Sequence, residues 1–348
     1  MIEFNVGTNF AFKTIDKAVE LNRRYKEDGL RISEFYGSLS GGTARPAFRI
    51  GNVSYTEIKL FIEECHAQGL KFNYTLNSPL TSYWFPKTAS DFAELVRTLE
   101  DLKVDIVTIS HMIPLEYIRQ FFDIEISTIL EVQSLEAIKY YTERFNAKKI
   151  CLSITKNRDF EFLRKLKKHD LAQHIELLAN EFCSIEGIPC QNFYRKSCYE
   201  LHALGGNEKN EQHGYPLKIC SRSRYKDPAS WIKANVIFPW DVVRYQQKTG
   251  ISKFKVSGRT LPTEYILYIM EAYMSQGIIM DDNILALWGH VDKVEKLDKT
   301  KIPKVYISAE SMKSMRFLKF FTDDYIDCQK TLCSECVYCY KILQAALR

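Results

Sequence analysis

The sequence predicts an α/β protein built on a TIM-type (β/α)8 barrel. Short apolar strand candidates alternate with amphipathic helix candidates along the first 280 residues. With 348 residues, of which 46% are hydrophobic and 26% charged, the chain can bury a large core. A doubly wound open sheet is the alternative, but the glycine fingerprint GxGxxG does not follow the first strand candidate.

The strand candidates are short apolar runs bounded by turn residues. They lie at residues 2–6, 32–37, 71–77, 104–110, 124–130, 148–154, 175–180 and 254–258. Helix candidates with apolar residues at helical spacing lie at 14–29, 55–69, 88–103, 114–122, 134–145, 159–169 and 262–277. In such a barrel the carboxyl ends of the strands carry the functional residues.

Two segments fall outside this alternation. An insertion at about 181–250, between the last two strand candidates, lacks clean periodicity, and a loop of this length is usually functional or stiffened by a ligand. The barrel is therefore assigned to residues 1–280 and a small cysteine-rich extension to residues 281–348. The extension is too short for a strong core of its own, which makes a metal staple reasonable.

Eight of the ten cysteines fall into two clusters. The members are Cys183, Cys190, Cys198 and Cys220 in the insertion, and Cys328, Cys333, Cys336 and Cys339 within DCQKTLCSECVYC in the extension. Closely spaced thiolates can converge on one metal centre. Disulfides need an oxidising compartment, and the start MIEFNVGTNF shows no signal peptide, so we expect metal binding in a cytoplasmic protein. Cys65 and Cys151 lie in apolar contexts that predict packed core thiols.

The spacing favours iron–sulfur over zinc. CxxCxxC in one stretch resembles the bacterial ferredoxin run more than two separated zinc-binding pairs. We expect one [4Fe-4S] cluster or two, with zinc as the alternative at the C-terminal site.

Five polar residues are candidates for substrate binding at the barrel rim. They are Arg45 and Arg49 after the second strand candidate, Asn73 on the third, Glu131 at the end of the fifth and Arg259 just past the eighth. A fixed guanidinium suits a carboxylate, although structural ion pairs are the alternative. No catalytic residue is identified. Asp241 and Arg244 are expected to pair and to order the insertion.

Several function classes lose support. No apolar run approaches the roughly 20 residues that span a bilayer, so no membrane span is expected. The formal net charge of +5 is mild and does not by itself indicate nucleic acid. GxSxG, P-loop and HExxH motifs are absent from the sequence, which leaves a hydrolase without a motif.

Three stretches together resemble the collagenase-like peptidase family U32. They are GGTARPAFRIGNVSYTEIKLFIEECHAQGLKFNYTLN, IELLANEFCSIEGIPC and GISKFKVSGRTLPTEYILYIMEAY. The resemblance implies a TIM-type barrel holding a [4Fe-4S] cluster, with Cys183 and Cys190 as ligands. Ala179 and Asn180 replace the family's His-Gly. The fourth ligand stays open between Cys198 and a cysteine of the extension.

The resemblance also implies the main hypothesis for function. Some family members hydroxylate tRNA, ribosomal RNA or a quinone precursor without oxygen, and others carry the name of collagenases. We therefore expect an iron–sulfur hydroxylase or related redox enzyme acting on RNA or a small aromatic molecule. The alternatives are a collagenase-like peptidase and a non-catalytic iron–sulfur subunit that works with a related subunit or an electron-donor protein.

Overall fold

In the computed structural model, eight parallel strands close into a barrel in the order β1 to β8, which confirms the predicted fold class. The strands are β1 Ile2–Gly7, β2 Leu30–Gly37, β3 Lys71–Leu76, β4 Ile106–Ile109, β5 Asp123–Ile126, β6 Lys149–Cys151, β7 Ile175–Leu178 and β8 Lys253–Val256. The structure describes residues 1–39, 53–77, 86–181, 227–233, 235–259, 261–277, 282–287, 305–323, 326–328 and 330–348.

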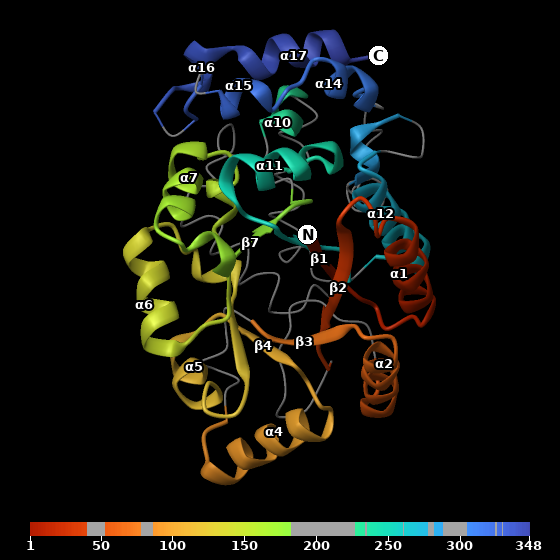
Figure 1. Cartoon of the computed structure of the whole chain (residues 1–348), viewed down its shortest axis with the longest axis vertical. Helices are drawn as coiled ribbons and strands as arrows, with labels where there is room; N and C mark the ends of the chain where they lie inside the picture. Colours follow the sequence, from red (N-terminus) through yellow and green to blue (C-terminus); the bar gives the residue numbers. More distant parts are fainter. Residues whose placement is uncertain are drawn as a thin grey trace.

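Helices surround the barrel (Figure 1). They are α1 Lys13–Arg24, α2 Tyr55–Ala67, α4 Ala89–Asp101, α5 Met112–Ile118, α6 Leu135–Phe145, α7 Phe160–Lys168, α10 Ala229–Ile232, α11 Val242–Thr249 and α12 Thr263–Ser275. Their apolar sides face the strands, as in α1, where Ile15, Ala18 and Leu21 are buried at helical spacing.

The apolar core lies between the strands and these helices. Phe72 of β3 meets Phe61 of α2 with ring centroids 6.3 Å apart, and Phe254 of β8 meets Tyr245 of α11 at the same separation. Since successive strand residues point to opposite faces, the neighbours of Phe72 and Phe254 point into the barrel. Several of those neighbours are polar.

The fifth strand is shorter than predicted. β5 ends at Ile126, and Thr128–Leu130 forms a 3₁₀ helix, η1. The side chain of Ser127 accepts a hydrogen bond from the amide of Ile129, which turns the chain at the rim. Glu131 follows in the left-handed conformation, with φ of 52°. Glu131 therefore lies beyond a turn and does not end the strand, contrary to the sequence expectation.

The C-terminal extension lies against one flank of the barrel, over α7, α10 and α11 (Figure 1). Its elements are η5 Ile284–Leu287, α14 Ala309–Ser314, α15 Lys319–Thr322, α16 Cys333–Cys336 and α17 Tyr338–Ala346. Lys330 pairs with Glu161 of α7 at 2.7 Å, and Arg244 of α11 pairs with Asp323 at 3.0 Å. The expected pairing of Arg244 with Asp241 is therefore wrong, because this guanidinium reaches out to the extension.

None of the helices in the described part of the chain combines the length and apolar character that a membrane span needs.

Candidate functional site

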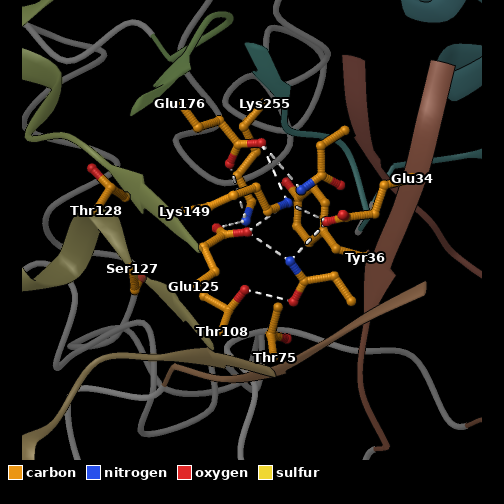
Figure 2. Close-up of polar contacts among 12 residues, drawn as sticks. Glu34, Tyr36, Thr75, Thr108, Glu125, Ser127, Thr128, Lys149, Glu176 and Lys255 are labelled. Carbon is orange, nitrogen blue, oxygen red and sulfur yellow. Dashed lines mark hydrogen bonds and ion pairs between the residues drawn. The ribbon is translucent and has the colours of Figure 1, made fainter. Parts of the chain in front are cut away.

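A ring of polar side chains fills the barrel interior (Figure 2). Each strand contributes one member, and the members in strand order are Asn5, Glu34, Asn73, Thr108, Glu125, Lys149, Glu176 and Lys255. All are buried; Lys149, the most accessible, is only 7% exposed. TIM-barrel interiors are usually dominated by branched apolar residues, so a buried ionic layer here is a departure that calls for a reason.

Asn73 is the bridge on one side of the ring. Its Nδ2 donates to Glu34 Oε1 at 2.8 Å and to Glu125 Oε2 at 2.6 Å. Its Oδ1 accepts a hydrogen bond from Thr108 Oγ1 at 2.7 Å. The amide of Asn73, predicted to bind substrate at the rim, thus orients two carboxylates inside the barrel.

Two lysines link the carboxylates on the other side. Lys149 Nζ lies 2.6 Å from Glu34 Oε1 and 3.1 Å from Glu125 Oε2. Lys255 Nζ bonds to Glu125 Oε1 and lies 3.7 Å from Glu176 Oε2. Glu125 therefore contacts both ammonium groups, whereas Glu176 stands farther from each.

This asymmetry separates the two carboxylates electrostatically. Burial alone would raise the pKa of Glu125, but Lys255 and Lys149 outweigh burial and lower the pKa to about 2. Burial raises the pKa of Glu176 to about 7, Glu125 adds to that rise, and the lysines oppose it. Burial likewise opposes the charge of Lys149, but the carboxylates raise its pKa well above the usual value. Proton exchange by the Glu176 carboxyl is thereby brought near neutral pH.

The ring connects to the barrel mouth through Tyr36 of β2. Lys255 Nζ lies 4.4 Å from the centroid of the Tyr36 ring, and Arg259 Cζ lies 5.5 Å from the same centroid. Gly7 makes room for this ring, because a Cβ at Gly7 would come within 3.0 Å of the Tyr36 hydroxyl. Arg259, predicted from the sequence as a binding residue, is half-buried, and its Nη1 donates to Thr75 Oγ1 at 2.7 Å.

Glu131 lies apart from this ring, after η1. It accepts a hydrogen bond from Ser153, whose hydroxyl also lies 2.8 Å from that of Thr155. The structure therefore gives Glu131 a hydroxyl partner on the loop after β6.

Six predicted site residues lie outside the described residues. They are Arg45, Arg49, Cys183, Cys190, Cys198 and Cys220. Their proposed roles in binding substrate and metal stay predictions.

The four cysteines of the extension are described, and all are partly exposed. Burial raises the pKa of the Cys328 thiol to about 11; Arg158 opposes this, while Cys339 and Cys336 add to it. Burial opposes the charge of Lys233, but Asp227 raises its pKa, and Cys333 and Cys339 add to that rise. Each of the four thiols therefore interacts electrostatically with another thiol of the set or with one of two cations, Arg158 and Lys233. Within the described ranges, no three His, Cys, Asp or Glu side chains stand at metal-ligand spacing.

Thiols are a donor type that metal centres use, but the structure does not bring three of these described thiols together at ligand spacing, so metal binding by the extension stays a prediction. Four thiols suit iron–sulfur or zinc, and nearby cations offset the negative charge that such thiolates bring. The other two cysteines are buried in different surroundings. Cys65 belongs to the main apolar core, whereas Cys151 contacts Ile154 and Leu178 in a separate small cluster.

Sequence reasoning missed most of the ring. It did not identify Glu34, Glu125, Lys149, Glu176 or Lys255. The signal was present as alternation. Strands buried on both faces normally read as continuous apolar runs, but IEI, IELL and FKV each place one charged residue at an inward position. Charged residues inside strand candidates of a predicted barrel therefore indicate a polar interior.

Comparisons with known proteins identify one family. The model of peptidase family U32 matches residues 36–283, more than half of the chain. An uncharacterized protease of Methanocaldococcus jannaschii is 22% identical over 341 residues, covering 96% of this chain and 93% of that protein. A solved U32 peptidase is 12% identical with a TM-score of 0.45, over 74% of this chain and 92% of that one. A solved β-N-acetylhexosaminidase is 11% identical with a TM-score of 0.36, over 96% and 79%. With the family model matched across the barrel, the chain belongs to peptidase family U32.

Proposed function

We propose that the chain is an iron–sulfur-dependent enzyme that modifies its substrate without molecular oxygen, by hydroxylation or a related redox step, at the barrel mouth. The observation that carries the proposal is the course of β7. Glu176 on this strand joins the interior ring, and Cys183 follows Leu178, the last residue of β7, by only five residues in the sequence. The predicted thiolate ligands therefore begin close along the chain to the carboxyl that can exchange a proton.

The balance of the reaction explains why both features are useful. If water supplies the oxygen, converting a C–H bond to C–OH releases two protons and two electrons. When bound, an iron–sulfur cluster can take up or pass on single electrons. The proposal therefore includes an electron-carrier protein as partner, and a ring carboxyl with a pKa near neutrality suits the movement of protons.

Arg259 supports the substrate class. Its guanidinium lies over the Tyr36 ring and is held by Thr75, which leaves a fixed cation beside an aromatic surface. Such a pair suits a small aromatic acid or an RNA nucleotide. We propose that the enzyme acts on one of these in the cytoplasm.

Anaerobic purification tests the redox part. We expect a brown protein with broad visible absorption, several irons per chain and acid-labile sulfide. Cys190→Ala is expected to lower the iron content and abolish modification of any small molecule or RNA that co-purifies. A colourless protein that holds zinc alone would overturn the proposal.

A peptidase is the second candidate, because the M. jannaschii relative is described as a protease. Incubation of the metal-replete protein with a peptide library tests it. Cleavage that disappears on a single substitution near the barrel mouth, such as Arg259→Ala, would favour a peptidase over the redox enzyme.

A further inference from the structure

A cavity lies where the C-terminal extension meets the barrel, beside α7 (Figure 1). Its volume of about 370 Å³ falls within the range of small-molecule sites. The charged and aromatic lining comes from both parts of the chain, and it includes Arg158, Glu161 and Arg164 of the barrel and Phe321, Asp327 and Lys330 of the extension. None of the described lining residues belongs to the interior ring. The cavity is therefore separate from the ring of carboxylates and lysines.

Arg158 is the buried part of this lining. It lies in the loop between η2 (Ile154–Lys156) and α7, and it is only 3% exposed. Its guanidinium lies 4.9 Å from the ring centroid of Phe317 and 5.2 Å from that of Phe321. These rings attract the charge but accept no hydrogen bond in the plane of the guanidinium. Among the described residues, Nε and Nη2 of Arg158 are buried without a hydrogen-bond partner.

The two unpaired nitrogens indicate the kind of ligand. Nε and Nη2 share one edge of the planar guanidinium, and N–H groups on one edge run parallel and bind two oxygens of a carboxylate or phosphate. Burying a cation without pairing its N–H groups costs free energy. An oxyanion at this edge of Arg158 would remove that cost.

The acidic residues near Arg158 do not fill this role. Lys330 lies 2.7 Å from Glu161 and 3.0 Å from Asp327, so it engages both carboxylates of the described lining. Arg158 also interacts electrostatically with Asp241, but burial raises the pKa of that carboxyl to about 7, and neither Nε nor Nη2 of Arg158 bonds to it. With three cations against two carboxylates, the described lining keeps a net positive charge.

The first turn of α7 adds to the preference for an anion. Phe160 and Glu161, the first two residues of this helix, both line the cavity. The N-cap side chain of Asp159 accepts a hydrogen bond from the amide of Phe162 at 3.0 Å, and amides earlier in a first turn have no partner within the helix. Helix N-termini bind phosphate groups through such amides and through the helix dipole.

We propose that this cavity binds an aromatic phosphate monoester, such as a nucleoside monophosphate. The phosphate lies at Arg158 and the start of α7, and the aromatic group packs against the apolar lining formed by Phe160, Phe321 and Ile326. The ligand touches both the barrel and the extension, so binding fastens one to the other. The inference goes beyond the proposed function, since it needs neither a metal nor the barrel mouth.

Calorimetric titration of the full chain with phenyl phosphate tests the site. Arg158→Met should weaken binding at least about tenfold, because two charge-assisted hydrogen bonds are lost. The same change should leave the ligand-free stability unchanged or raise it, because methionine replaces an unpaired buried charge. A purely structural arginine predicts the reverse, which is unchanged affinity with lower stability in urea unfolding, and that result would overturn the inference.

Two further variants complete the test. Lys168→Met is the matched control, since it removes an exposed charge at the other end of α7 and should change affinity by less than about twofold. Ile326→Trp fills the cavity from the extension without altering its charge, and it should abolish binding even if Arg158→Met does not fold. Phenyl phosphate that binds Ile326→Trp as tightly as wild type would rule the cavity out.

The choice of ligand separates this cavity from the barrel mouth. Binding that survives Arg259→Ala and falls with Arg158→Met belongs to the cavity, whereas binding that falls only with Arg259→Ala belongs to the mouth and contradicts the inference. Inorganic phosphate should bind at least about tenfold more weakly than phenyl phosphate, because it leaves the apolar lining uncovered; equal affinities would count against the aromatic ligand.

Limited proteolysis tests the link between the barrel and the extension. Saturating phenyl phosphate should slow cleavage of residues 305–348 in wild type, because a ligand that binds only the docked form stabilises it. It should not slow cleavage in Arg158→Met. AMP and a 5′-phosphorylated oligonucleotide, compared in the same assay, distinguish a free nucleotide from the end of an RNA chain. Equal cleavage rates with and without every one of these ligands would defeat the proposed bridging.

Discussion

Arg259 reaches across the barrel mouth from the end of β8 to β3, where its Nη1 donates to the hydroxyl oxygen of Thr75 at 2.7 Å. The same hydroxyl lies 3.1 Å from that of Ser38, after β2. The guanidinium is therefore held in one place above the ring of Tyr36 before any substrate arrives, which is the arrangement that gives a charge its largest effect on binding.

Arg259→Ala should weaken binding of an aromatic carboxylate about ten- to hundredfold, because one charge-assisted hydrogen bond is lost. Benzoate, followed by calorimetric titration, is a simple probe. Arg31→Ala is the matched control, since Arg31 lies near the start of β2, at the opposite end of the barrel. Equal effects of the two substitutions would show that Arg259 acts only through the overall charge.

Glu176→Gln should change how stability depends on pH. The pKa of Glu176 in the folded protein is about 7, above the value of roughly 4.3 expected for an unfolded chain. Between these values the folded state binds more protons, so this residue lowers the free energy of unfolding as pH rises. Relative to wild type, the glutamine variant should gain on the order of 3 kcal/mol between pH 4 and pH 8. Urea unfolding at both pH values measures the difference, and parallel pH profiles would contradict the assignment.

Lys149→Met should destabilise the barrel strongly. It leaves Glu34 and Glu125 buried without their shared ammonium group, at a cost of about 3–5 kcal/mol. Adding Glu34→Gln should restore part of the loss, since one of the unpaired charges is then removed. Lys59→Met, which breaks an exposed pair with Asp101, is the control and should leave urea unfolding unchanged. A small effect of Lys149→Met would mean that water or a proton replaces the lysine at little cost.

The two cysteine clusters should behave as separate centres. Cys190→Ala is expected to remove one centre and the activity while the extension keeps its metal. Cys336→Ala should remove the other centre and raise the protease sensitivity of residues 305–348. Metal analysis and limited proteolysis of both variants check this. Loss of all metal from either single variant would show one shared centre in place of two.

Periodicity in the sequence was sufficient to predict the barrel. Alternation of strand and helix candidates is a local property, and it predicts a parallel sheet because each parallel strand needs a helix between it and the next. Eight strand candidates and the missing GxGxxG then favoured the closed barrel over an open sheet, and the structure confirms the closure. Strand ends were predicted less well. The side chain of Ser127 competes with the strand for backbone hydrogen bonds, which ended β5 at Ile126 and placed Glu131 beyond a 3₁₀ turn.

By itself the sequence determined the fold class, the family and the position of Arg259 just past β8, because these depend on local pattern and chain order. Only the tertiary structure decided that Glu34, Lys149 and Glu176 form one ring, since strands far apart in the chain come together only on barrel closure. The same holds for Arg158, because its guanidinium lies over the ring of Phe317, which is some 160 positions away in the sequence. Pairing of buried charges depends on their separation in space. A sequence indicates that separation only for residues that lie near one another along the chain.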